Sequence, residues 1–139
     1  MLKLSLLLKL QGLFAAAAIA YLLASGIREQ TMGTPLSVAP VVQSILIFCV
    51  YIGCLFLPSI GRIGWYRVAM VPAILAFGGG GVIGNIVTYF SGGEASYASF
   101  GAWVVAVGIN AFGTVLNIIA ALGWFSTSRS APSPKHPHS

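Results

Sequence analysis

Apolar residues form four long runs along the chain, separated by short polar joints. A helix that crosses a membrane needs about 20 mostly apolar residues. The runs reach this length at roughly 4–23, 38–57, 68–90 and 98–125. The pattern therefore predicts an all-α fold, in which residues 1–125 form one integral membrane four-helix bundle.

The joints between the runs carry turn residues. Glycine, proline and serine are concentrated at 33–35, 58–61 and 91–93. Because joints this short force successive helices to run in opposite directions, we expect a transmembrane bundle with antiparallel neighbours.

The basic residues indicate how the bundle is oriented. With four spans, six of the seven Lys and Arg residues fall on one side of the membrane. These six are Lys3, Lys9, Arg62, Arg67, Arg129 and Lys135. The other side receives Arg28 together with both acids, Glu29 and Glu94. By the positive-inside rule, the N- and C-termini are both predicted to be cytoplasmic.

The N-terminus has a competing interpretation. A basic start, an apolar stretch and the small residues at 18–20 are also features of a cleaved signal peptide. Lys9 and Gln11 interrupt the apolar stretch, which argues against cleavage. We favour an uncleaved first helix whose Lys9 side chain reaches the inner headgroups.

Composition supports membrane insertion and limits other functions. The chain is 58% hydrophobic and only 6% charged, whereas soluble domains carry about 25% charged residues. The net charge of +5 is spread between the apolar runs, so we expect no nucleic-acid binding. Cys49 and Cys54 point to different helix faces, and neither they nor His136 and His138 have metal-site spacing. We expect no metal and no cofactor.

The last segment, residues 126–139, differs in kind from the four runs. It is polar and rich in proline and serine. Such a segment cannot bury enough apolar surface to order itself. It is predicted to be a disordered cytoplasmic tail.

The stretch FGGGGVIGN, residues 77–85, matches the letters of a dinucleotide-binding loop. That loop requires a preceding strand and an acid about 20 residues further on, and the chain offers neither. Small residues here more simply allow close helix packing in lipid. Gly80 and Gly84 lie four apart on the third run, and Gly113 belongs to a similar stripe on the fourth. A first-run stripe is formed by Gly12, Ala16, Ala20 and Ala24. A hinge at the glycines is the alternative to rigid packing.

Uncharged polar residues within the runs are the candidate site. No Asp or Glu lies inside a run, which disfavours a proton-coupled carrier. At about 1.5 Å per residue, Asn110 falls near the midplane, and Gln43 and Asn85 fall in the outer half. One interpretation is that these amides, together with Thr88, Thr114 and Asn117, bond to each other across helices. The other is a polar intramembrane site for a lipid headgroup, a quinone or a neutral solute.

These features favour a small multi-pass membrane protein that acts through helix–helix interaction. It would be an accessory or assembly subunit of a membrane complex, or a homo-oligomer, with membrane lipids around it. The alternative is a carrier or channel for a small neutral solute or lipid. An enzyme acting on a lipid or thiol conjugate ranks last, because only Arg62, Arg67, Arg28 and Glu29 are available for chemistry. We therefore expect that the protein is not an enzyme and that it lies in a bacterial inner membrane.

Overall fold

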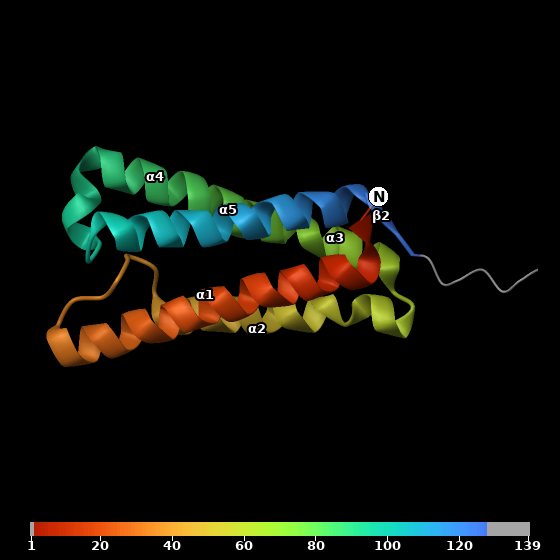
Figure 1. Ribbon diagram of the computed structural model, residues 1–139, viewed down its shortest axis with the longest axis horizontal. Coiled ribbons are helices and arrows are strands. Elements are labelled where there is room, and N and C mark those ends of the chain that lie inside the picture. Colours follow the sequence, from red (N-terminus) through yellow and green to blue (C-terminus); the bar gives the residue numbers. More distant parts are fainter. Residues whose placement is uncertain (1, 128–139) are drawn as a thin grey trace, which may run out of the picture.

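The computed structural model describes residues 2–127 and is almost entirely helical (Figure 1). The helices are α1 (Leu4–Met32), α2 (Val41–Leu55), α3 (Ile63–Ile74), α4 (Asn85–Thr88) and α5 (Phe100–Leu122). A π-helix, η2 (Leu75–Gly84), joins α3 to α4. Short helical turns are η1 (Leu57–Ile60), η3 (Tyr89–Gly93) and η4 (Glu94–Ser96). Of the predicted tail, residues 128–139 lie outside the described residues.

Four helical segments are long and apolar enough to cross a membrane. They are Leu4–Met32, Val41–Ile60, Ile63–Gly93 and Phe100–Leu122. This confirms the all-helical class and the presence of four helices long and apolar enough to cross a membrane.

The helix ends differ from the ends of the apolar runs. The first helix continues past residue 23 to Met32, because Arg28, Glu29 and Gln30 are good helix formers although they are polar. It stops at Gly33, whose φ of 77° is left-handed and favours glycine, and whose amide donates to the Glu29 carbonyl at 2.9 Å. Helix propensity and a glycine cap therefore set this end, rather than the loss of hydrophobicity.

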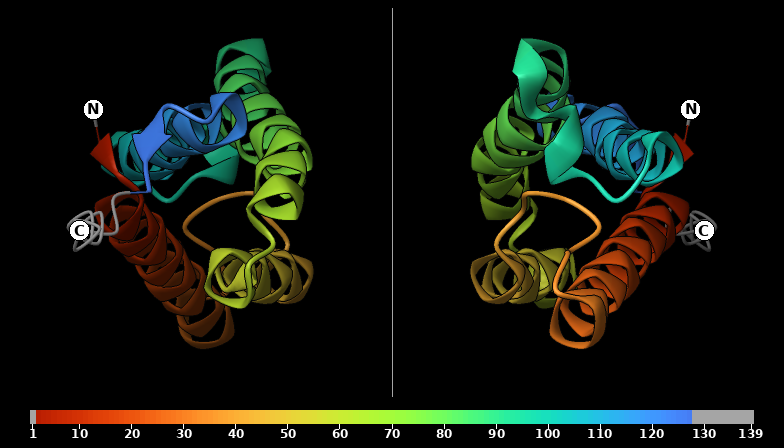
Figure 2. Two further views of the ribbon diagram at one scale, coloured as in Figure 1. Left: turned by 90° about the vertical axis from the view of Figure 1, so that its right-hand side faces the viewer. Right: turned by 90° about the vertical axis from the view of Figure 1, so that its left-hand side faces the viewer.

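The four long segments surround a common centre when the bundle is viewed end-on (Figure 2). Helix α5 packs against both α1 and α3, and α1 also packs against α2. Two short strands, β1 (Leu2–Lys3) and β2 (Phe125–Ser126), pair in parallel with Leu2 opposite Phe125. This pairing brings both ends of the described chain to the same end of the bundle (Figure 1).

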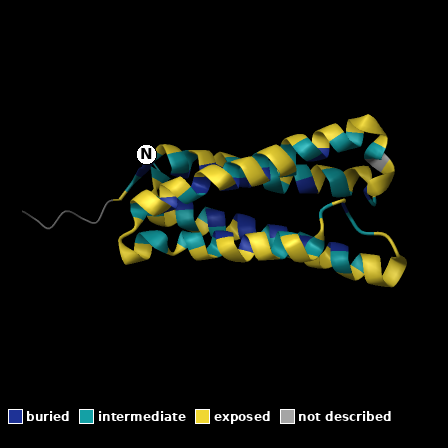
Figure 3. Ribbon diagram, turned by 180° about the vertical axis from the view of Figure 1, so that it is seen from behind, coloured by how far each residue is buried: buried dark blue, intermediate teal, exposed yellow. Residues whose placement is uncertain are grey.

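An aromatic cluster forms the middle of the core. The Phe14 ring contacts Phe48, Tyr51 and Phe77 edge-on, with ring centroids 5.2–5.6 Å apart. Gly113 of α5 lies directly against Phe14, and a Cβ there would overlap three ring atoms, the farthest at 2.5 Å. Buried residues face inward and the outer faces are exposed (Figure 3). Those outer faces carry many large apolar side chains, as expected for a surface in contact with lipid.

The glycine run forms the π-helix η2. Pro72 precedes it and removes a backbone donor, and four consecutive glycines follow. A Cβ on Gly80 would meet nothing within 4 Å, and on Gly84 it would meet only the Gly79 carbonyl oxygen, at 3.4 Å. The close approaches to α5 occur instead at Gly78, where an added Cβ would lie 3.0 Å from the Thr114 side chain, and at Gly81.

Residue spacing identified a face rich in small residues on this segment. It could not tell which of the four consecutive glycines turns toward α5, because that depends on the rotation of the helix about its axis. The rotation is fixed by packing against the neighbouring helix.

Candidate binding cavity

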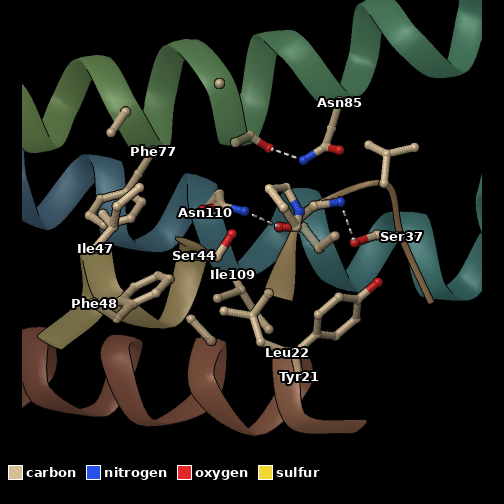
Figure 4. A pocket seen from close by; sticks show the side chains of 18 of the residues that line it. Tyr21, Leu22, Ser37, Ser44, Ile47, Phe48, Phe77, Asn85, Ile109 and Asn110 are labelled. Carbon is tan, nitrogen blue, oxygen red and sulfur yellow. Dashed lines mark hydrogen bonds between the residues drawn. The ribbon is translucent and has the colours of Figure 1, made fainter. Parts of the chain in front are cut away.

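A cavity of about 370 Å³ lies among α1, α2, η2 and α5 (Figure 4). Its volume falls within the range of about 300–1,000 Å³ that is typical of ligand sites. Most of the wall is apolar, including Leu22, Ile47, Phe48, Phe77 and Ile109. The cavity is therefore suited to a molecule that is largely apolar.

All three amides proposed from the sequence line this cavity. Gln43 lies on α2. Asn85 lies at the start of α4 and Asn110 on α5 (Figure 4). They make no hydrogen bond to one another. The Asn85 amide nitrogen donates to the Gly81 carbonyl at 2.6 Å, and that of Asn110 donates to the Ala106 carbonyl at 2.9 Å. Both bonds stay within one helical segment, so these amides do not link helices to each other in the way the first interpretation required.

Asn85 is held by two aromatic residues. The Tyr97 hydroxyl donates to its Oδ1 at 2.5 Å, and the Trp103 indole N–H donates to its backbone carbonyl at 3.1 Å. Burial raises the pKa of Tyr97, because the charged phenolate would lose its solvation. The hydroxyl therefore stays protonated at neutral pH and keeps donating. Both polar ends of the Asn85 side chain are used, so Asn85 shapes the wall and has little capacity left for a ligand.

Asn110 and Gln43 retain hydrogen-bonding capacity. Within the described residues, Asn110 Oδ1 and the whole Gln43 amide have no hydrogen-bond partner, and Gln43 is exposed. The Asn110 side chain lies against Gly81, where a Cβ would be only 2.9 Å from the Asn110 Cβ and closer still to the amide. Glycine at this position leaves the room that Asn110 needs beside the cavity.

The joint between α1 and α2 lines one end of the cavity. Residues 37–40 line the cavity, and Ser37 is only 3% exposed. The Leu36 amide donates to Ser25 Oγ at 3.0 Å, and the Ala98 amide donates to the Leu36 carbonyl at 3.1 Å. These bonds tie the joint to α1 and to the segment before α5.

The lining residues limit the chemistry of the cavity. None of them is Asp, Glu, Lys, Arg, His or Cys. The Tyr21 hydroxyl, which lies in the wall, already donates to the Ala102 carbonyl at 2.8 Å. The cavity can therefore bind an uncharged molecule through amide and hydroxyl groups. Across the described residues, no three His, Cys, Asp or Glu side chains are grouped as a metal site would need.

A second polar cluster was not identified from the sequence. Gln11 of α1 donates to Asn117 Oδ1 at 3.0 Å, and the Tyr51 hydroxyl donates to the same oxygen at 2.6 Å. The Tyr66 hydroxyl donates to Gln11 Oε1. All four side chains are buried and come from different helices, so this cluster links α1, α2, α3 and α5. The feature of the sequence that could have revealed this cluster is the presence of two amides and two tyrosines inside or beside apolar runs.

A groove of about 760 Å³ runs along the outside of α1 and α2. Gly12, Ala16 and Ala20, from the stripe predicted on the first run, line it. Ala16 and Ala20 are exposed, and a Cβ on Gly12 would meet nothing within 4 Å. In the described part of the chain, this stripe therefore has no helix packed against it.

Comparison with protein-family models, with curated proteins and with solved structures finds no match for this chain. The cavity, the outer groove and the four membrane-crossing helices are thus the basis for the functional conclusion.

Proposed function

We propose that this protein is a small multi-pass protein of a bacterial inner membrane that binds a small neutral solute or a lipid in its intramembrane cavity. Neighbouring helices run antiparallel and both termini are cytoplasmic. The charge asymmetry supports this orientation. The pairing of β1 with β2 is consistent with it, because it holds both ends of the described chain at the same end of the bundle.

One observation carries the proposal more than any other. Gln43, Asn85 and Asn110 are far apart in the sequence and come from three helical segments, yet they line a single cavity. Two of them keep unused hydrogen-bonding groups there. Unpaired polar groups in hydrocarbon cost free energy unless a partner satisfies them. A bound molecule with an apolar body and one or two polar groups would supply that partner.

Gentle extraction from the native membrane, followed by native mass spectrometry, tests the proposal. We expect an uncharged molecule to copurify in stoichiometric amount. Asn110→Leu should lose most of it while the bundle still folds, since the Asn110 amide bonds only within α5. Val105→Leu, on an exposed part of the same helix, is the control and should retain the molecule. Equal retention in both variants, or no copurifying molecule in the parent protein, contradicts the proposal.

A second candidate function is supported by the outer groove. Small residues allow helices in lipid to approach closely, and the Gly12–Ala16–Ala20 face has no partner within the described chain. We propose that this face would dock a helix of a membrane-protein partner or of a second copy, as an accessory subunit would require. The same mass spectra test it. A dimer or stoichiometric complex that is lost in Ala16→Leu but kept in Val115→Leu supports it, and a monomer in all three proteins contradicts it.

A further inference from the structure

Among the long helices, the cavity is open to the outside between α2 and η2. Its lining residues on α1 and α5 are buried or half-buried, such as Leu22 and Ala106, each 5% exposed. The exposed lining residues of the membrane-crossing helices lie on the other two segments: Gln43 and Ile47 on α2, and Ala76 and Gly80 on η2. The two segments meet where Phe48 stacks on Phe77 with ring centroids 4.7 Å apart. This aromatic pair forms one wall of the cavity (Figure 4).

This opening faces hydrocarbon if the bundle crosses a membrane. Gln43 and Ile47 belong to the crossing segment Val41–Ile60, and Ala76 and Gly80 to Ile63–Gly93. At the end of the cavity, residues 37–40 form part of the wall and are tied down through Leu36. A molecule that enters through the opening therefore comes from the bilayer, so it must dissolve in lipid.

The groups near the opening indicate what the molecule carries. The Gln43 amide and the Ser44 hydroxyl have no side-chain hydrogen bond within the described residues, and both can donate. Donors of this kind suit a carbonyl oxygen. The stacked Phe48 and Phe77 offer an aromatic wall, against which a flat ring packs well. A volume of about 370 Å³ holds a ring head group, while a long apolar tail would extend through the opening.

We propose that the ligand is a quinone-type lipid, which has an uncharged ring bearing carbonyl oxygens and an apolar tail. It enters sideways between α2 and η2. One carbonyl accepts hydrogen bonds from Gln43 and Ser44, the ring lies against Phe48 and Phe77, and the tail remains in the bilayer. This assignment rests on the binding function proposed above and specifies its ligand class and entry route.

Photolabelling of the full chain in lipid nanodiscs tests the assignment. The probe is a short-chain azido-quinone, and labelled peptides are mapped by mass spectrometry. We expect saturable labelling in α2 and η2. Gln43→Leu should weaken probe affinity about fivefold, which corresponds to the loss of one neutral hydrogen bond. The matched control, Gln30→Leu, removes an exposed glutamine near the C-terminal end of α1, outside the cavity lining, and should leave the probe affinity unchanged.

Three results would overturn the assignment. They are labelling that does not saturate, equal affinity in Gln43→Leu and Gln30→Leu, or displacement of the probe by diacylglycerol more readily than by unlabelled quinone. The copurification experiment separates this failure from failure of the binding function. A copurifying molecule that is lost in Asn110→Leu but is not a quinone removes the quinone assignment and leaves the binding function standing. If no molecule copurifies and labelling by the probe does not saturate, both the quinone assignment and the proposed binding function are contradicted.

Discussion

Replacing Gly113 by alanine tests the packing at the centre of the bundle. The new Cβ would overlap Cε1, Cζ and Cδ1 of the Phe14 ring. That ring cannot easily move aside, because Phe48, Tyr51 and Phe77 surround it edge-on at 5.2–5.6 Å. Relief of the overlap therefore requires α1 and α5 to separate.

The size of the effect follows from two opposing terms. Overpacking a filled core costs about 1–3 kcal/mol. Alanine in place of glycine favours a helix by about 1 kcal/mol. Gly108→Ala on the same helix gains the second term alone, because a Cβ there meets nothing within 4 Å. We therefore expect Gly113→Ala to be about 2 kcal/mol less stable than Gly108→Ala, and the difference isolates the steric term.

The assay is unfolding by sodium dodecyl sulfate in mixed micelles, followed by circular dichroism. Free energies of unfolding are compared for the parent chain and the two variants. If Gly113→Ala and Gly108→Ala unfold with the same free energy, the close contact between Phe14 and Gly113 is refuted.

Two further substitutions test other parts of the structure in the same unfolding assay. Gln11→Leu removes hydrogen bonds to Tyr66, Asn117 and the Met70 sulfur. At about 0.6 kcal/mol for each bond, the free energy of unfolding should fall by about 2 kcal/mol. An unchanged free energy of unfolding would show that the cluster does not hold the helices together. At the start of α5, the Ser99 side chain accepts a hydrogen bond from the Ala102 amide at 3.0 Å. Ser99→Ala removes this cap and should lower the free energy of unfolding by about 1 kcal/mol. An unchanged free energy of unfolding would show that Ser99 does not cap the helix.

The sequence predicted the number of membrane-crossing helices because each apolar run exceeds the length that a bilayer requires. The first apolar run ends near residue 23, whereas the helix continues through Arg28 and Glu29 to Met32, because the length of an apolar run does not set where a helix ends. Backbone hydrogen bonding and capping set the true end, and these do not depend on the solvent that surrounds the helix.

The rise per residue of a helix predicted the depth of Gln43, Asn85 and Asn110 along the bundle, and these three residues line one cavity. Their bonding was not, because it depends on how each helix is rotated about its axis. Of the polar residues expected to bond across helices, Asn117 does so, with Gln11 as its partner, and both side chains are buried within the bundle. Rotation also explains why Gly78 and Gly81 approach α5 closely, rather than Gly80 and Gly84.

The most direct measurement of the central claim compares leucine at two adjacent glycines. Gly80 lines the cavity, and a Cβ there meets nothing within 4 Å, so we expect Gly80→Leu to occupy cavity space without overlap at its Cβ. A Cβ on Gly79 is equally unobstructed, but Gly79 does not line the cavity. The amount of copurified small molecule per protein chain is measured by mass spectrometry for the parent chain and both variants. The account predicts that Gly80→Leu loses the bound molecule and Gly79→Leu retains it; the same amount in both variants would contradict it.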